Sequence, residues 1–186
     1  MKEPRILASR IIYEHDYVMI MEDDLEFSDG TKKTWDYACP KGKEAARICA
    51  LTDKRELIFV KEYRGAARRR VLKLPGGFVN PGEGPVDAAR RELEEETGFL
   101  AGSGEVIAQE VPTDGSWRDL LVSVVFFSHL QEGGVMRRED GEQDMEVLRI
   151  PLEEAVRMTH NLEIEDHKTI FGILALQKHL KNNPYV

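Results

Sequence analysis

An acidic helix predicted over residues 85–97 is the feature that most constrains this chain of 186 residues. A proline suits its first position, good helix formers follow, and Gly98 ends it as a glycine in the left-handed conformation would. Side chains at i, i+3 and i+4 share a helix face, so Val86, Ala89 and Leu93 predict an apolar stripe. The helix is therefore expected to pack against a core along one side only.

The same helix concentrates negative charge on a second face. Glu92, Glu95 and Glu96 fall together there, whereas Glu94 points elsewhere. No lysine lies between them, so we expect no i, i+4 pairing to relieve their repulsion. Carboxylate oxygens are the ligands that Mg²⁺ prefers, and the glycine loop at residues 75–77 would let backbone approach a ligand closely. The alternative is a solvated acidic helix, which is what most charge runs are.

The residues of this segment resemble the Nudix box, G-x5-E-x7-R-E-U-x-E-E-x-G-U, where U is a bulky apolar residue. The box is filled without departure by Gly77, Glu83, Arg91, Glu92, Leu93, Glu95, Glu96, Gly98 and Phe99. Many fixed positions at fixed spacing make this signal specific, although it spans only residues 77–99. Within it, Glu83 and Arg91 resemble the family's internal ion pair, which an ordinary structural salt bridge would also explain. The flanks are similar to the nucleoside diphosphate sugar pyrophosphatase branch (ADP-ribose / GDP-mannose pyrophosphatase-like) at Glu62-Tyr63-Arg64, Leu74-Pro75-Gly76-Gly77 and residues 163–169.

The resemblance implies a metal site on the acidic face. Glu92 and Glu96 are the first expected ligands of Mg²⁺, or of Mn²⁺ in its place. Glu95 follows closely, as a ligand or as a catalytic group, and the main-chain carbonyl of Gly76 is a further ligand. Metal ions can neutralise a diphosphate, bridge its oxygens and acidify the attacking water.

Substrate contacts are expected from an arginine, a glycine and three aromatic residues. Arg64 matches the Glu-Tyr-Arg of related enzymes, and its planar fork suits a bidentate grip on phosphate, although a surface arginine is the alternative. Gly77 lies in the loop expected to approach the ligand. Trp35 and Tyr37 offer faces for stacking on a nucleoside, with core packing as the alternative role of both. Trp117 is a third aromatic candidate for the pocket.

The resemblance implies that the general base comes from an acidic loop before the last strand, which here is residues 138–146. Two registers of the family pattern disagree by one residue. The first makes Glu142 the base and Asp144 an auxiliary metal ligand, whereas the second puts glycine and glutamine at those places. We predict Glu142, with Glu139 and Asp140 as further candidates, and a solvated acidic loop as the alternative. A base must lie within hydrogen-bond reach of the water, which a sequence does not show.

Charge, hydropathy and cysteine content restrict the binding partners and the cellular compartment that we expect for this protein. Lys+Arg is 26 and Asp+Glu is 34, a formal charge of −8, which argues against nucleic-acid binding because that requires a basic stripe. No apolar run approaches the roughly 18 residues needed to span a bilayer. The N-terminus also lacks the apolar core of a signal peptide, so we expect a cytoplasmic protein without a membrane partner. Cys39 and Cys49 have no C-x-x-C partner and are predicted as reduced, half-buried thiols.

The rest of the chain predicts a mixed sheet with helices on its faces, an α/β (α+β) class. The predicted strands are residues 6–13, 17–27, 31–38, 46–51, 57–63, 71–74, 105–111, 120–129 and 145–150. The dense apolar run at 120–129 is expected to be covered on both faces, and residues 131–143 are expected to form a long loop. Helices are predicted over 151–160 and 168–181. The apolar face of the last helix is predicted from Ile170, Ile173, Leu174 and Leu180.

The resemblance implies a more specific architecture. It is an α/β/α Nudix sandwich over residues 45–186, preceded by a small β domain over residues 1–44. In the branch that this chain resembles, that β domain is exchanged or shared across a homodimer.

Together these observations predict metal-dependent hydrolysis of a nucleoside diphosphate sugar, such as ADP-ribose or GDP-mannose, to a nucleoside monophosphate and a sugar phosphate. The ADP-ribose subgroup usually carries a proline where this chain has Asp114, so strict ADP-ribose specificity is not expected. One alternative is a Nudix hydrolase of dinucleotides such as NADH or diadenosine polyphosphates. Another is a catalytically silent nucleotide sensor, which the complete set of box carboxylates argues against.

Overall fold

A computed structural model describes residues 2–40, 42, 44–114, 118–138 and 142–183. The chain divides into two compact units. One comprises Met1–Glu44 with Pro112–Leu121, and the other comprises Ala45–Val111 with Val122–Val186. None of the helices in the described part of the chain is long and apolar enough to cross a membrane.

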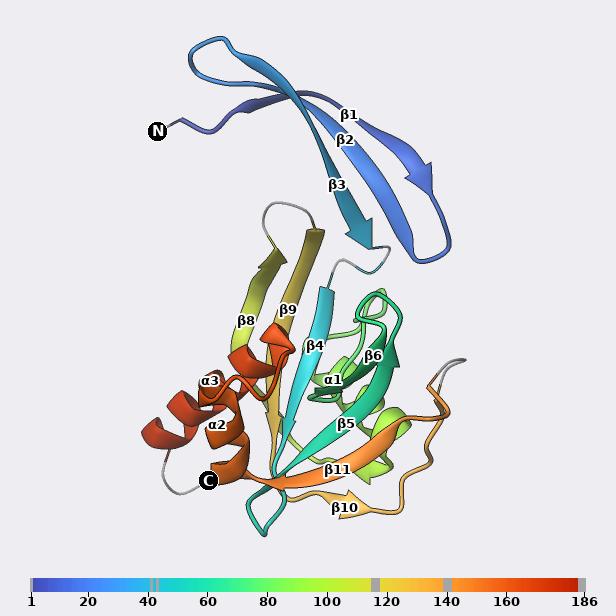
Figure 1. The fold of residues 1–186 in the computed structure, drawn as a ribbon, viewed down its shortest axis with the longest axis vertical. Coiled ribbons are helices and arrows are strands. Elements are labelled where there is room, and N and C mark those ends of the chain that lie inside the picture. Colours follow the sequence, from blue (N-terminus) through green and yellow to red (C-terminus); the bar gives the residue numbers. More distant parts are fainter. Residues whose placement is uncertain (1, 41, 43, 115–117, 139–141, 184–186) are drawn as a thin grey trace. The chain divides into compact units, whose positions relative to one another are not determined.

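The first unit is built on an antiparallel sheet of three long strands, β1 (Arg5–Glu14), β2 (Val18–Glu26) and β3 (Lys32–Pro40) (Figure 1). The predicted turn between β2 and β3 is confirmed, with Gly30 at a φ of 83° where glycine is favoured. The end of β3 pairs in parallel with the start of β9 at Ala38 and Arg118. Every residue of β1 is exposed, so this strand has solvent on both faces within a single chain.

The second unit holds the remaining strands, except that the end of β8 and the start of β9 belong to the first unit. They are β4 (Glu44–Ala50), β5 (Glu56–Arg64), β6 (Arg69–Lys73), β8 (Gly104–Asp114), β9 (Arg118–Phe127) and β11 (Glu146–Pro151). In one sheet, β9 lies between β4 and β8; in another, β5 lies between β11 and β6. A short antiparallel pair joins β7 (Phe99–Leu100) to β10 (Gln131–Glu132). The prediction of loop throughout residues 131–143 is therefore wrong at its start, because two residues are too few to show a period.

The three helices lie close to their predicted bounds: α1 (Pro85–Thr97), α2 (Leu152–His160) and α3 (His167–Asn182). In α1 the proline stands in the first turn, and Gly98 adopts a φ of 72° while its N–H donates to Glu94 O. The signals that predicted where this helix begins and ends are therefore both present in the structure.

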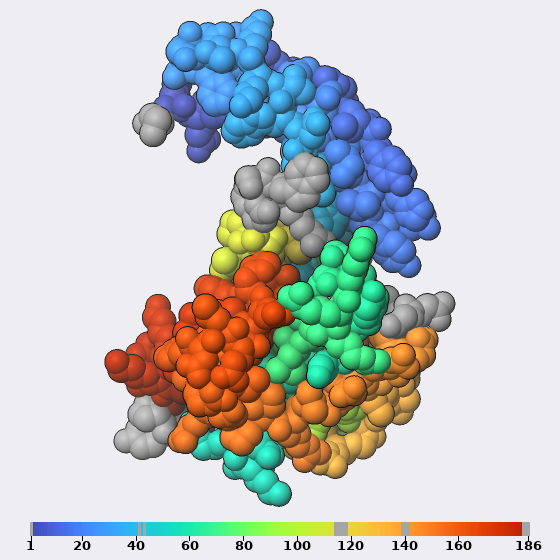
Figure 2. Space-filling view, in the orientation of Figure 1, coloured from blue at the N-terminus to red at the C-terminus, as the bar shows by residue number. Residues whose placement is uncertain are grey.

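Alternating burial shows that the sheets are covered on both sides. Along β4, Ile48 belongs to the apolar cluster around Ala89 and Leu93 of α1, whereas Cys49 belongs to the cluster around Ile173 of α3. Successive residues of a strand point to opposite faces, so α1 covers one face while α2 and α3 cover the other (Figure 1). In the space-filling view the orange and red atoms of α2 and α3 lie at the front of this unit (Figure 2). The predicted mixed α/β class is confirmed, and so is the double burial of β9 over its second half.

Two details of the packing differ from expectation. Leu174 is 44% exposed, because the buried stripe of α3 runs through Ile173 and Leu176 and a neighbouring position turns about 100° away from it. Cys39 and Cys49 are free, as predicted, but both are buried rather than half-buried. Burial raises the pKa of Cys49 to about 12.

Candidate active site

Two adjacent glycines bring the loop after β6 against both β4 and α1. Gly76 has a φ of 141°, and a Cβ added there would lie 2.1 Å from Ala46 O. A Cβ added at Gly77 would lie 2.2 Å from Glu92 Oε1. Ala46 N donates to Gly77 O at 2.9 Å, which fixes the loop against β4. Glycine is thus needed at one position for the backbone and at the next to admit a carboxylate.

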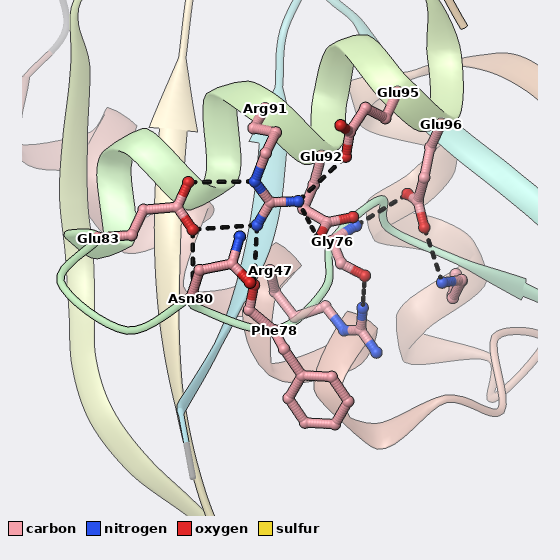
Figure 3. A network of polar contacts seen from close by, with 10 residues as sticks. Arg47, Gly76, Phe78, Asn80, Glu83, Arg91, Glu92, Glu95 and Glu96 are labelled. Carbon is pink, nitrogen blue, oxygen red and sulfur yellow. Dashed lines mark hydrogen bonds and ion pairs between the residues drawn. The ribbon is translucent and has the colours of Figure 1, made fainter. Parts of the chain in front are cut away.

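Arg91 organises the acidic face of α1 (Figure 3). Its guanidinium donates to both oxygens of Glu83 at 3.1 and 3.0 Å, to Glu92 Oε1 at 2.8 Å, to Glu95 Oε2 at 3.0 Å and to Phe78 O at 3.0 Å. All five N–H groups of the fork are used. The expected ion pair between Arg91 and Glu83 is confirmed. The expectation that no i, i+4 pair relieves the carboxylates is wrong, because it considered lysines only and Arg91 pairs with Glu95 at that spacing.

Glu96 points away from Arg91 and into the protein. It is buried, with Oε2 accepting from Gly76 N at 2.9 Å and Oε1 accepting from Lys73 Nζ at 3.3 Å. Lys73 also lies 2.7 Å from Glu62 Oε1. The sequence analysis did not identify Lys73, although a lysine directly before an apolar residue and the glycine loop was a usable signal.

The carboxylates of this face lack full compensation by positive charge. Burial raises the pKa of Glu92 to about 7; Arg91 opposes the rise, and the neighbouring charges of Glu96 and Glu95 add to it. A divalent cation beside these oxygens would offset that repulsion, so the donor set fits Mg²⁺ or Mn²⁺ by type and charge. Within the described residues, no three His, Cys, Asp or Glu side chains are gathered closely enough to hold a metal ion as they stand. The reason is visible in their contacts: each predicted carboxylate ligand faces a protein cation.

The carbonyl of Gly76, the fourth predicted ligand, accepts a hydrogen bond from Arg47 Nη1 at 2.9 Å. A carbonyl oxygen has two lone pairs, so one acceptor position is left. Arg47 is buried in β4 and was missed by the sequence analysis. A single arginine inside the apolar run of residues 45–51 was the signal that could have identified it.

The N-terminus of α3 holds the start of the glycine loop through a hydrogen bond. Asp166 caps the helix by accepting from the N–H and the hydroxyl of Thr169 at 2.9 and 2.8 Å, and Thr169 Oγ1 accepts from Leu74 N at 2.9 Å. Burial raises the pKa of Asp166, but Arg47, Lys168 and Thr169 outweigh it and lower the pKa to about 2. The family-like segment at residues 163–169 therefore supports the glycine loop through its cap.

The remaining predicted residues fall in several places. Arg64 has a half-exposed side chain 2.9 Å from Glu62 Oε1. Trp35 and Tyr37 lie on β3 in the first unit, where Trp35 is exposed and its ring meets Phe27 edge-on at 6.0 Å. Neither is in the core of its unit, which leaves their predicted nucleoside contact open to test.

The predicted base is only partly described. Glu142 is half-buried, and its carbonyl accepts from Met145 N at 2.9 Å. Asp144 is exposed and lies 3.7 Å from Arg70. Glu139 and Asp140, with Trp117, lie outside the described residues.

Comparison with known proteins shows which family has this arrangement. The model of the NUDIX domain matches residues 42–171, which is most of the chain. The chain belongs to the Nudix family. As a Nudix hydrolase it carries the box on α1 and the glycine loop, and the α/β class predicted from the sequence is the class of that fold.

Relatives and a solved structure cover nearly the whole length of this Nudix protein. It is 29% identical over 175 residues to the ADP-ribose pyrophosphatase of Bacillus subtilis (strain 168), covering 94% of this chain and 93% of the relative. It is 29% identical over 202 aligned positions to the ADP-sugar pyrophosphatase of Mus musculus, covering 97% and 90%. A crystal structure of an ADP compounds hydrolase superposes with a TM-score of 0.87 at 23% identity, covering 100% and 98%, and shows the same fold.

Proposed function

We propose that this Nudix hydrolase cleaves the diphosphate bond of a nucleoside diphosphate sugar, with ADP-ribose and related ADP-sugars as the first class to test. The observation that carries the proposal is the complete acidic face of α1, held against Gly76 and Gly77 in the fold of the family. Two relatives whose names state ADP-ribose or ADP-sugar pyrophosphatase activity span nearly the whole chain. The expected products are a nucleoside monophosphate and a sugar phosphate.

The carboxylates of Glu92, Glu95 and Glu96 and the carbonyl of Gly76 would hold Mg²⁺ or Mn²⁺. When bound, the metal supplies positive charge for the diphosphate oxygens and lowers the pKa of water. Arg91 keeps Glu92 and Glu95 oriented towards one another through its fork. Since water is a weak nucleophile, a carboxylate base is needed to take its proton, and Glu142, with Glu139 and Asp140 as alternatives, is proposed for that role.

Arg64 is proposed to grip the substrate phosphate. Its guanidinium is half-exposed and pairs on one side with the buried Glu62, which leaves donors of the fork directed to solvent. In the overall reaction, the oxygen of water bonds to one phosphorus while the bond from that phosphorus to the bridging oxygen breaks. The bridging oxygen leaves on the second phosphate, and the base carries away the proton of the water.

The test is hydrolysis of a panel of sugar nucleotides and dinucleotides with and without Mg²⁺. Purified protein would be incubated with ADP-ribose, other ADP-sugars, GDP-mannose and NADH, and the products separated by ion-exchange chromatography. Metal-dependent release of a nucleoside monophosphate and a sugar phosphate supports the proposal. No turnover of any sugar nucleotide would refute it, and turnover of NADH alone would favour the dinucleotide alternative.

Glu96→Gln and Glu94→Gln form a matched pair for the same assay. The first removes a proposed ligand, and the second makes the same chemical change on the same helix, at a side chain that accepts from Val135 N away from the acidic face. We expect Glu96→Gln to lower kcat by about 100-fold or more, as loss of a group that stabilises the transition state does, and Glu94→Gln to stay within about threefold.

We also propose that the protein acts as a cytoplasmic homodimer that uses its first unit. In support, β1 exposes a run of large apolar side chains, and a second copy is a partner that could cover them. They include Ile6, Ile11, Ile12 and Tyr13. Light scattering after size exclusion should give twice the mass of 21.2 kDa, whereas a monomer at micromolar concentration would refute the dimer. The buried free thiols are consistent with a reducing compartment.

A further inference from the structure

A buried lysine lies between two buried carboxylates directly beneath the acidic face of α1. The side chain of Lys73, at the end of β6, is 3% exposed, and those of Glu62 and Glu96 are 5% and 4% exposed. Lys73 Nζ lies 2.7 Å from Glu62 Oε1 and 3.3 Å from Glu96 Oε1. Neither Lys73 nor Glu62 belongs to the box.

Strand pairing explains why these residues meet. Lys73 pairs with Val60 across the antiparallel strands β5 and β6. Glu62 lies two residues further along β5, so its side chain is on the same face as those of Val60 and Lys73. That face looks towards α1, because Ile58 of the same alternation packs in the cluster with Leu93. Helix α1 faces this side of β5 and β6, and its Glu96 contacts Lys73 beside Glu62.

The two carboxylates use Lys73 in different ways. Glu96 Oε1 accepts a hydrogen bond from the ammonium, and its other oxygen accepts from Gly76 N. Glu62 Oε1 is closer to the ammonium, but in the described chain it is a buried atom without any hydrogen bond. The contact between Lys73 Nζ and Glu62 Oε1 is therefore an ion pair whose angles do not fit a hydrogen bond. Arg64 Nη2 lies 2.9 Å from the same oxygen, so Glu62 is a buried carboxylate that already lies at ion-pair distance from Lys73 and can take over the ammonium from Glu96.

We propose that Lys73 is a positioning residue for Glu96: it holds Oε1 while Oε2 accepts from the glycine loop, and it turns fully onto Glu62 when Glu96 takes up a divalent cation. The inference rests on the proposed metal-dependent function, and it adds Lys73 and Glu62 to the residues that set the affinity for the metal. An ammonium and a divalent cation compete for the same carboxylate oxygen, because each repels the other at contact distance. Glu62 provides the second place for the ammonium, so the charge is never left buried and unpaired.

The two residues of the pair then have opposite effects on metal affinity. Without the ammonium of Lys73, the oxygen of Glu96 is free and the local charge is more negative, so a cation binds more tightly. Without the charge of Glu62, the ammonium has only Glu96 to pair with, so a cation binds more weakly. A charge that acts through space alone gives the same two signs, so the kcat of Lys73→Met, which only an orienting role is expected to lower, is measured as well.

The experiment is a calorimetric titration of Mn²⁺ into the full chain without substrate. Lys73→Met should lower the Kd for Mn²⁺ about tenfold, and Glu62→Gln should raise it about tenfold, as expected for one buried charge near the site. Lys73→Arg, which retains the charge, should stay near wild type. Lys61→Met is the matched control, since it removes the same charge from the opposite face of β5, and its Kd should change by less than about twofold.

Turnover provides a second readout. Lys73→Met should lower kcat because Glu96 loses its fixed orientation, while KM for the sugar nucleotide changes little. The combination of tighter metal binding with slower turnover separates positioning from general damage to the fold. Thermal unfolding checks each variant. If Lys73→Met does not fold, Glu62→Gln carries the test, because it keeps the size of the side chain and removes only its charge.

The outcomes distinguish this inference from the function on which it rests. Unchanged or weaker Mn²⁺ binding in Lys73→Met, or unchanged or tighter binding in Glu62→Gln, overturns the role of Lys73 while metal-dependent hydrolysis by the wild type stands. A wild-type protein that neither binds Mn²⁺ nor hydrolyses sugar nucleotides overturns both. Opposite shifts in the two variants, with a lower kcat in Lys73→Met and the Lys61→Met control unchanged, support the exchange.

Discussion

Gly77→Ala should separate activity from stability. The added Cβ would lie 2.2 Å from Oε1, 2.3 Å from Cδ and 2.6 Å from Oε2 of Glu92. These distances are about 0.9 to 1.3 Å short of a normal contact of about 3.5 Å. The group that must move is the end of a flexible side chain rather than backbone, so the carboxylate rotates away and the loop remains. We expect the proposed metal ligand to be displaced while the fold persists.

The magnitudes follow from that displacement. Misplacing a reacting or ligating group by 1 Å costs about 100-fold in rate, so kcat should fall by about that factor. The stability cost is the contact between Glu92 and the partly exposed Arg91, about 0–1 kcal/mol for such a pair. For a chain of this length that shifts Tm by no more than about 4 °C.

The assay measures kcat with ADP-ribose and Mg²⁺ beside Tm from differential scanning calorimetry. Gly102→Ala is the matched control, because a Cβ there meets nothing within 4 Å, and it should leave both values near wild type. Gly76→Ala is the contrasting variant, since its Cβ would lie 2.1 Å from the backbone oxygen of Ala46 and should destabilise by more than about 3 kcal/mol. Wild-type kcat in Gly77→Ala would refute the assignment of Glu92.

Two further predictions concern the supports of the site. The pKa of Asp166 is lowered from 3.8 to about 2, so its stabilisation is fully present above about pH 4 and lost as pH falls through 2; the lowering is worth about 2 kcal/mol. Asp166→Asn, which can still cap the helix, should lose about that much in urea unfolding at pH 7 and little at pH 2, and an equal loss at both would contradict the charge argument. Arg91→Lys keeps the charge but loses the five-donor fork, and should lower stability by about 2 kcal/mol and kcat by at least tenfold. Arg90→Lys, on the same helix but paired with Asp87, should leave kcat unchanged, and equal losses in both variants would show that the fork has no special role.

The local chemistry of α1 could be predicted from the sequence because it depends on near neighbours. An opening proline, the left-handed Gly98 and the spacing of Ala89 and Leu93 all act within a few residues, and each feature is present in the structure. The strands were predicted to within a few residues for the same reason. Among the strands of the described residues, only the two-residue pair of β7 and β10 was missed entirely.

The partners of the acidic face could not be predicted, because they come from distant parts of the chain. Lys73 and Arg47 reach Glu96 and Gly76 from β6 and β4, and nothing in their local sequence states which way a strand faces. The relief of Glu95 by Arg91 was local and was overlooked because only lysines were considered. Leu174 was misplaced for a related reason, since an apolar residue beside a buried stripe looks the same in sequence whether or not a neighbour covers it.

The proposed hydrolysis depends on a divalent cation that binds on the face of α1 that carries Glu92 and Glu96. Anomalous diffraction from crystals soaked in Mn²⁺ with a non-hydrolysable sugar nucleotide tests it most directly. We expect a strong peak at a distance of about 2.1 Å from oxygens of both side chains, a distance typical of octahedral oxygen coordination. The proposal would be contradicted if the analogue were bound, the manganese peaks lay only elsewhere, and Glu96 were still turned towards Lys73.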